Sequence, residues 1–241
     1  MLFKQTLVKL AVIGALAAPM AASAFVIGPT SPGKWGSPVF GTGATVTWSY
    51  SGSIDCSADG GGTCSSFADF MPVGFEASVN AAFAAWEAVA DLHFVQVADG
   101  GEAFNAPGTS GDIRLGGHAF DGPLGTLAHG YYPPENGDTA AGDIHFDSAE
   151  NWKLGWGGPG FNVYQVLTHE LGHALGLNHT AVPNSLMNPF YTESFQGPQA
   201  DDIAGMQYIY GPSVVPEPST WALFGLGLVA LAFGRRRAMK Q

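Results

Sequence analysis

The segment HELGHALGLNH, residues 169–179, restricts the fold of this chain more than any other stretch. His169 and His173 stand four residues apart in an apolar run, and a helix places such residues one above the other on one face. Gly176 suits a helix end, because glycine readily adopts the left-handed conformation that closes many helices. The sequence therefore predicts a helix that ends near Gly176 and a chain that turns back to bring His179 toward the same point.

Three imidazoles directed at one point predict a metal site. Three neutral histidines leave the fourth tetrahedral position of a zinc ion open to water, which is typical of catalytic rather than structural zinc. Glu170 follows the first histidine and is predicted to accept a proton from that water and pass it to a leaving amine. The alternative is a histidine-rich helix without metal, which would bury several imidazoles without partners at a cost in free energy.

The motif of residues 169–179 resembles that of the metzincin metallopeptidases, HExxHxxGxxH followed by a methionine turn. Ser185-Leu186-Met187-Asn188-Pro189 resembles that turn. The resemblance implies that Met187 lies beneath the metal as an apolar floor, whereas a methionine in an apolar run would otherwise be interpreted as a core residue.

Within the metzincins, residues 35–211 resemble the matrixins. His179-Thr180 is similar to the end of their zinc motif, residues 125–129 (GTLAH) to their substrate-binding edge strand, and Pro189-Phe190-Tyr191 to the wall of their S1′ pocket. On such an edge strand an extended peptide is held by backbone hydrogen bonds. The resemblance implies that substrate contacts come from Leu127, Ala128, Pro189 and Tyr191.

A second metal region is implied by the same resemblance. Residues 120–129 (FDGPLGTLAH) and 142–152 (GDIHFDSAENW) resemble the matrixin loops that hold a structural zinc and a calcium. The implied zinc ligands are His118, His129 and His145, and the implied calcium ligands are Asp121, Asp147 and Glu150. The family has a His-x-Asp pair on a longer loop where this chain has only GGHA (116–119), so a fourth, acidic zinc ligand is not evident. Water at that position or an empty site are the alternatives.

The remaining periodicity predicts an α+β domain. Residues 75–92 place Phe75, Val79, Phe83 and Trp86 on one helical face, and two more helices are predicted at 162–176 and 198–211. Short strands bounded by Gly, Pro and Asp are predicted at 44–50, 93–98, 111–117, 125–132 and 142–146. With the resemblance, this order implies a zincin-like catalytic domain with a twisted, mostly parallel sheet of about five strands and three helices.

The N-terminal segment predicts export. Residues 1–24 carry Lys4 and Lys9 before an apolar run and end in Ala22-Ser23-Ala24, the pattern of a secretory signal peptide. The catalytic domain is then expected to span residues 25–213. A first transmembrane helix is the alternative, which the short apolar core disfavours.

The C-terminal segment, residues 214–241, changes abruptly in composition. Pro216-Glu217-Pro218, an apolar stretch from Trp221 to Phe233 and the cluster Arg235-Arg236-Arg237 resemble the PEP-CTERM sorting signals of exported bacterial proteins. The arginines fit a segment whose C-terminal end faces the cytoplasm. The resemblance implies sorting by an exosortase-type transpeptidase, a transient membrane anchor, and a domain at the cell surface or outside the cell.

Cys56 and Cys64 are the only two cysteines, and they enclose the loop SADGGGT. In an exported chain a disulfide is favoured over two free thiols. Such a short ring would contribute roughly 2–3 kcal/mol. It is therefore predicted to fix a local loop rather than to hold the domain together.

Charge argues against a nucleic-acid partner. The chain has 20 acidic and nine basic residues, and only three of the basic ones, Lys34, Arg114 and Lys153, lie outside the two terminal segments. A domain so acidic suits cation-binding loops or cationic ligands, although solubility alone would also favour it.

The sequence thus favours an exported zinc endopeptidase that acts on extended peptides, with zinc and calcium as cofactors. One alternative is a catalytically silent, metal-stabilised module of the cell surface or matrix, because the second metal region departs from the family pattern and nothing like the family's Pro-Arg-Cys-Gly propeptide segment appears between Phe25 and the domain. Glu170 argues against this alternative, since a silent module does not need that carboxylate. A zinc hydrolase acting on a non-peptide bond has only general zinc chemistry in its support.

Overall fold

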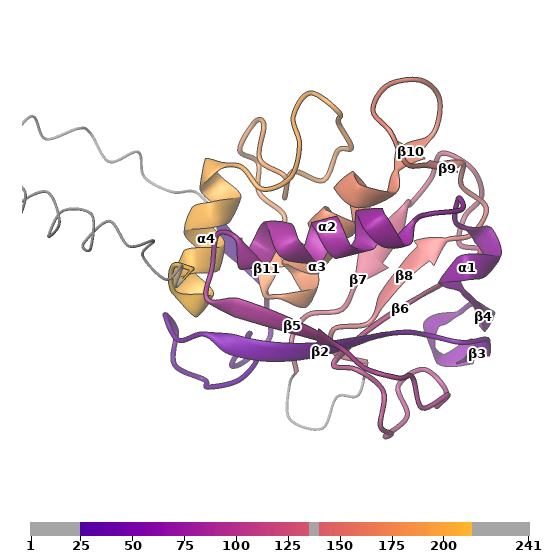
Figure 1. The fold of residues 1–241 in the computed structure, drawn as a ribbon, viewed down its shortest axis with the longest axis horizontal. Helices are drawn as coiled ribbons and strands as arrows, with labels where there is room; N and C mark the ends of the chain where they lie inside the picture. Colours follow the sequence, from indigo (N-terminus) through magenta and orange to yellow (C-terminus); the bar gives the residue numbers. More distant parts are fainter. Residues whose placement is uncertain (1–24, 135–139, 214–241) are drawn as a thin grey trace, which may run out of the picture.

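The computed structural model describes residues 25–134 and 140–213, so the predictions for the signal segment and the C-terminal tail lie outside the described residues. A mixed sheet forms one layer, and helices α2 (Glu76–Glu87) and α3 (Val163–Ala174) lie side by side over it (Figure 1). Over the two described ranges, no helix combines the length and the apolarity needed to cross a membrane.

The five predicted strands form the centre of the sheet. They are β2 (Ala44–Tyr50), β5 (Leu92–Gln96), β6 (Ile113–His118), β7 (Ala128–Gly130) and β8 (Ile144–Asp147). Strand β2 runs parallel to β5 and to β6, β6 runs parallel to β8, and only β7, beyond β8, is antiparallel. The predicted α+β class and the mostly parallel sheet are confirmed.

A β-hairpin that the sequence did not predict extends this sheet. Strands β3 (Ile54–Cys56) and β4 (Gly62–Ser66) pair with each other, and β4 continues along the edge of β6 where β2 ends. The hairpin holds a 3₁₀ turn at Ser57–Asp59 and the disulfide Cys56–Cys64. Glycine and aspartate, which are frequent in this segment, have low strand propensity, and this explains why the sequence indicated a loop here.

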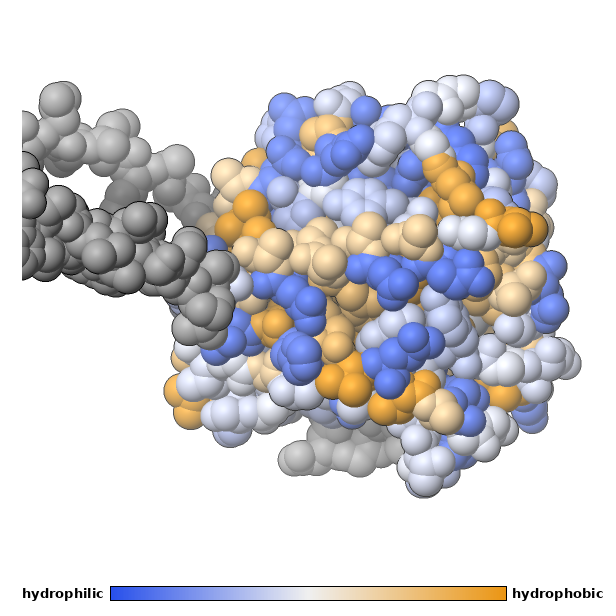
Figure 2. All heavy atoms as spheres, viewed as in Figure 1, coloured by the Kyte–Doolittle hydropathy of each residue, from blue (hydrophilic) through white to orange (hydrophobic). Residues whose placement is uncertain are grey.

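The three predicted helices are α2, α3 and α4 (Ala200–Tyr210), and a single turn, α1 (Phe67–Phe70), precedes them. On α2, the predicted apolar face is buried, and Trp86 donates a hydrogen bond to the carbonyl of Thr168 on α3 (3.0 Å). The outer face exposes Ala77, Ala81, Ala84 and Ala88, and Figure 2 shows it as a pale apolar band. Alanine favours a helix at surface positions, where packing does not decide.

Four short strands complete the described elements. Strands β9 (Trp152–Lys153) and β10 (Phe161–Asn162) pair in parallel before α3 begins. Strand β1 (Val26–Ile27) pairs antiparallel with β11 (Leu177–Asn178). Since His179 follows β11 directly, the pairing of β1 with β11 stabilises the segment that carries this histidine.

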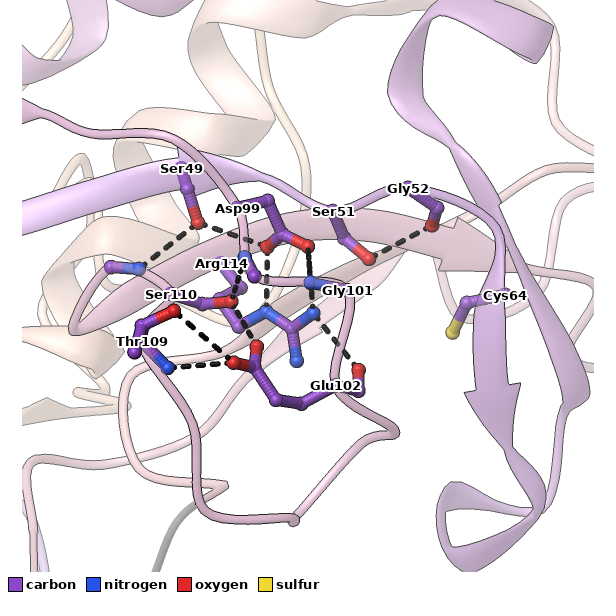
Figure 3. A network of polar contacts seen from close by, with 12 residues as sticks. Ser49, Ser51, Gly52, Cys64, Asp99, Gly101, Glu102, Thr109, Ser110 and Arg114 are labelled. Atoms are coloured by element: carbon purple, nitrogen blue, oxygen red, sulfur yellow. Dashed lines mark hydrogen bonds and ion pairs between the residues drawn. The ribbon is translucent and has the colours of Figure 1, made fainter.

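Arg114 anchors a long loop to strand β6 (Figure 3). Its guanidinium donates to both carboxylate oxygens of Asp99, at 2.9 and 3.1 Å, and to the carbonyl of Glu102 at 3.1 Å. The Glu102 carboxylate in turn accepts hydrogen bonds from Thr109 and Ser110. Both members of the Arg114–Asp99 ion pair are largely buried, so the loop is fixed to the strand that ends at His118.

Candidate active site and metal centres

Helix α3 carries the first two histidines of the motif and begins at a capped end. The side chain of Asn162 accepts a hydrogen bond from the backbone of Gln165 (3.1 Å), which satisfies one of the free donors of the first turn. The helix runs through His169 and His173, whose ring centroids lie 4.9 Å apart on one face.

The turn after α3 depends on Gly176. Its φ is 107°, and a β-carbon at this position would stand 2.3 Å from the carbonyl oxygen of Gly33. Only glycine fits this conformation and this contact. The turn returns the chain so that Nε2 of His179 lies 3.2 Å from Nε2 of His169 and 3.0 Å from Nε2 of His173.

Backbone carbonyls orient the two helical imidazoles. Nδ1 of His169 lies 2.6 Å from the carbonyl oxygen of Leu186, and Nδ1 of His173 lies 2.8 Å from that of Leu177. A carbonyl can only accept, so Nδ1 carries the proton in each ring and the lone pair of Nε2 faces the common point. Burial lowers the pKa of His169 to about 4 and that of His173 to about 3. Both are therefore neutral at pH 7, the state that binds metal.

Glu170 is buried beside this cluster. Burial raises its pKa to about 8, and a hydrogen bond from the Gly130 backbone opposes that rise. Divalent charge at the histidines would favour the ionised carboxylate and so draw the pKa down. A carboxylate with a pKa near neutrality suits general acid–base catalysis.

Met187 lies under helix α3, and Asp202 of α4 holds its turn in place. The Asp202 carboxylate accepts hydrogen bonds from the Ser185 hydroxyl (2.5 Å) and from the backbones of Leu186 (2.7 Å) and Met187 (3.0 Å). The sequence analysis did not identify Asp202. Its one signal is an acidic pair in the first turn of a predicted helix, which alone indicates only a capped helix.

A cleft of about 550 Å³ opens beside the histidines, and the four predicted substrate-contact residues line it. Leu127 and Ala128 lie at the start of strand β7, and Pro189 and Tyr191 belong to a wall that follows the methionine turn. The hydroxyl of Tyr191 accepts a hydrogen bond from the Asn162 backbone (2.8 Å), which fixes that wall to the start of α3. The cleft is further lined by Gln165, Val166 and Phe195, which the sequence did not single out.

The three histidines of the implied structural zinc site also come together. Among the described residues, ligand atoms of His118, His129 and His145 lie within 4.8 Å of one another, and Asp59 belongs to the same group. The sequence reading missed Asp59, because it lies in the loop between the cysteines and far from the zinc-loop motif. The structure thus places an acidic side chain beside the three histidines, where the sequence made none evident.

Among the described residues, the three implied calcium ligands do not form so tight a group, and Asp147 ends strand β8. The Asp121 carboxylate accepts hydrogen bonds from Thr126, and Glu150 accepts one from the Leu124 backbone (2.5 Å). Within the described residues, Oδ2 of Asp147 is buried and has no hydrogen-bond partner. A buried carboxylate oxygen without a partner is costly unless a cation binds it, so this loop fits a hard cation that prefers oxygen.

A helix-borne histidine pair, a third histidine beyond a glycine turn and a methionine turn below them are arranged as in the metzincins. The sheet, with its antiparallel edge strand next to the cleft, agrees with that class. The chain belongs to the matrixin family, whose model matches residues 67–211.

Individual relatives agree with the family match. The chain is 40% identical over 143 residues to matrix metalloproteinase-20 of Homo sapiens, covering 57% of this chain and 28% of that protein. It is 37% identical over 150 residues to karilysin of Tannerella forsythia, covering 60% and 30%. It is 41% identical over 145 residues to interstitial collagenase of Sus scrofa, covering 59% and 29%. The chain thus spans less than a third of the length of these relatives.

The tail matches a second model, the PEP-CTERM protein-sorting motif, over residues 214–237. This confirms the resemblance seen in the Pro-Glu-Pro, apolar and arginine-rich segments, and it indicates export and sorting to the cell surface. Matrixins are zinc-dependent endopeptidases that use catalytic and structural zinc and calcium, and the histidine clusters of this chain are consistent with that metal content.

Proposed function

We propose that this protein is an exported, zinc-dependent endopeptidase. The observation that carries the proposal is the convergence of three imidazoles, with Nε2 of His179 at 3.2 and 3.0 Å from Nε2 of His169 and His173, beside a buried glutamate and a cleft of about 550 Å³. His169, His173 and His179 would hold the zinc ion. When bound there, zinc supplies a Lewis acid that lowers the pKa of water and polarises a carbonyl.

Glu170 performs the proton transfers of the proposed reaction. As the oxygen of a water molecule attacks the peptide carbonyl carbon, the Glu170 carboxylate takes a proton from that water. When the carbon–nitrogen bond breaks, the same group gives the proton to the departing amine. The Gly130 backbone, which donates to Glu170, keeps the carboxylate directed at the cleft between β7 and α3.

Strand β7 and the wall that contains Tyr191 position the substrate. The strand pairs with β8 along one edge, and its first residue, Ala128, borders the cleft, so an extended peptide would add to the sheet as one more strand. Side chains of the cleft are mainly apolar, including Val166, Leu186 and Phe195, so we infer an apolar residue on the substrate at S1′.

The further metals are proposed to be structural. His118, His129 and His145 would bind a second zinc, and Asp121, Asp147 and Glu150 would contribute to a calcium site. These ions would fix the loops on either side of strand β7. We also infer that residues 1–24 act as a signal peptide, that residues 25–213 form the catalytic domain, and that the tail anchors the chain in the membrane until an exosortase-type enzyme processes it.

The decisive experiment measures cleavage of a mixed peptide library by the purified full-length chain, by Glu170→Gln and by a chelated sample that is then given zinc. Glu76→Gln is the matched control, because it removes an exposed carboxylate at the start of α2. Cleavage should persist in the control, disappear with Glu170→Gln or chelation, and return with zinc.

The opposite result is equally informative. A folded chain that binds zinc at residues 169–179 and cleaves no peptide would overturn the peptidase proposal in favour of the silent, metal-stabilised module. Cleavage that survives Glu170→Gln would instead exclude Glu170 as the general base.

A further inference from the structure

We propose that the disulfide-closed loop 56–64 supplies Asp59 as the fourth ligand of the second zinc site, and that the disulfide thereby sets the zinc affinity of that site. The inference rests on the metal proposed for His118, His129 and His145, and it is independent of catalysis. The ligand would come from the hairpin β3–β4, a segment that lies before the part of the chain matched by the family model.

The geometry of Asp59 is that of a ligand rather than of an ordinary hydrogen-bond acceptor. Its Oδ2 lies 2.8 Å from Nε2 of His118, 3.1 Å from Nε2 of His129 and 2.5 Å from Nδ1 of His145. One carboxylate oxygen has two lone pairs, so three ring nitrogens compete for it. The other oxygen already accepts a hydrogen bond from the Tyr131 hydroxyl. A cation among the four groups would resolve this crowding, because each nitrogen could then present a lone pair.

Contacts around the cluster orient its members. Nδ1 of His118 lies 3.1 Å from the carbonyl oxygen of Ala119, so Nδ1 carries the proton and Nε2 is free to bind metal. The side chains of Asp59, His118 and His145 are nearly buried, with relative exposures of 5, 5 and 2%. Burial of one carboxylate with two imidazoles, beside the partly exposed His129 (34%), favours a cation, and three nitrogens with one oxygen form a donor set that zinc accepts.

The loop is built to bring Asp59 to this position. Asp59 ends the 3₁₀ turn that follows Cys56, and a β-carbon on Gly61 would stand 2.3 Å from the ring of His118. Glycine at this position therefore lets the loop backbone lie against the imidazole. The Cys56–Cys64 disulfide closes the loop at its base, so it restricts the positions that Asp59 can take when the metal is absent.

The test measures zinc affinity of the second site alone, in the full-length chain with His169→Ala and His173→Ala, which remove the first site. Titration against a chromophoric chelator gives the zinc dissociation constant. Asp59→Asn should raise it at least about ten-fold, since loss even of a supporting residue typically costs 10–100-fold. Asp55→Asn is the matched control, because this carboxylate of the same hairpin is exposed, accepts its hydrogen bonds from Ser57 among the described residues, and lies outside the histidine cluster; the constant should be unchanged.

A second variant tests the disulfide. Cys56→Ser with Cys64→Ser should also raise the dissociation constant, by less than Asp59→Asn does. Substitution is preferable to reduction, because Sγ of Cys64 lies 3.9 Å from Nε2 of His145, and a free thiol there would itself bind zinc. Circular dichroism verifies that each variant is folded.

The outcomes separate the two proposals. Unchanged affinity in Asp59→Asn would refute the ligand, and unchanged affinity in the serine variant would refute the role of the disulfide. Absence of any zinc at the second site would overturn the inference while peptide cleavage by the parent chain still supported the proposed function. Loss of affinity in Asp59→Asn without any peptidase activity in the parent chain would support the inference alone.

Discussion

Met187 packs directly against Gly172: a β-carbon on Gly172 would stand 2.3 Å from the Met187 sulfur and 3.0 Å from its methyl carbon. Trp86 of the neighbouring helix is 3.4 Å from the same point. The helix that carries the metal-binding histidines and the turn below it therefore meet with no room for a side chain between them.

Gly172→Ala is expected to destabilise the protein by roughly 1–3 kcal/mol, because Met187 is buried and cannot move aside freely. A loss of stability would identify the contact, because replacing glycine with alanine at an unobstructed helix position would stabilise the protein instead. Chemical denaturation gives the free energy of unfolding. In a double-mutant cycle, Gly172→Ala should destabilise the protein less when Met187→Ala is also present. If the effects of the two substitutions on the free energy of unfolding were strictly additive, the contact would not limit packing.

Gly176→Ala tests the turn that returns His179 to the metal site. The left-handed backbone alone is expected to cost roughly 1–3 kcal/mol, and the contact with the Gly33 carbonyl adds to it. The variant should also lose zinc from the first site. Gly158→Ala is the control, because its φ of 76° is also left-handed but nothing lies within 4 Å of its added β-carbon. Equal effects of the two substitutions on zinc content would contradict the role assigned to the turn.

Asp99→Asn is expected to make the free energy of unfolding depend less on pH in the acidic range. Burial raises the pKa of Asp99, but hydrogen bonds from Arg114 and Gly101 and the charge of Arg114 outweigh it and leave the pKa below 3.8. The ion pair therefore stabilises the fold above about pH 4, and this stabilisation is lost as the pH falls through the folded-state pKa.

At pH 6 the variant should be less stable by about 3 kcal/mol, because it leaves the Arg114 charge buried without the carboxylate that neutralises it. The difference between parent and variant should shrink between pH 4 and pH 2, which urea denaturation at each pH would reveal. A difference that stays constant over that range would show that the titration of Asp99 does not contribute.

Calcium is expected to raise the melting temperature of the parent chain, and Asp147→Asn should abolish most of that rise. Because Oδ2 of Asp147 is buried without a partner among the described residues, the substitution should cost little in calcium-free buffer. Differential scanning calorimetry with and without calcium provides the test. If calcium raised the melting temperature of Asp147→Asn as much as that of the parent chain, Asp147 would not be a calcium ligand.

The sequence was sufficient to predict the centre of the fold and most of the site, because those features depend on local patterns. Spacing alone places His169 and His173 on one face, and Gly176 marks the turn that follows. The five central strands and three helices also follow from short-range periodicity, and the structure confirms them.

Asp59 and Asp202 could not be predicted in the same way, because their roles depend on contacts across long stretches of chain. Asp59 meets His145 across a separation of 86 residues, and Asp202 meets Met187 across 15. In the sequence, each is one acidic residue among 20, and no fixed spacing links it to the histidine motif. Only the pairing of β4 with β6 and the docking of α4 bring these carboxylates to their sites.

The long separations within the second histidine cluster also have a kinetic consequence. Asp59 lies 59 residues from His118 and 70 from His129, so the cluster can form only after the hairpin, β6, β7 and β8 have assembled. Interactions that are absent from the folding transition state act on the rate of unfolding rather than on the rate of folding. An ion at this cluster would therefore prolong the lifetime of the folded protein, and with it the time before an unfolded chain is open to proteolysis.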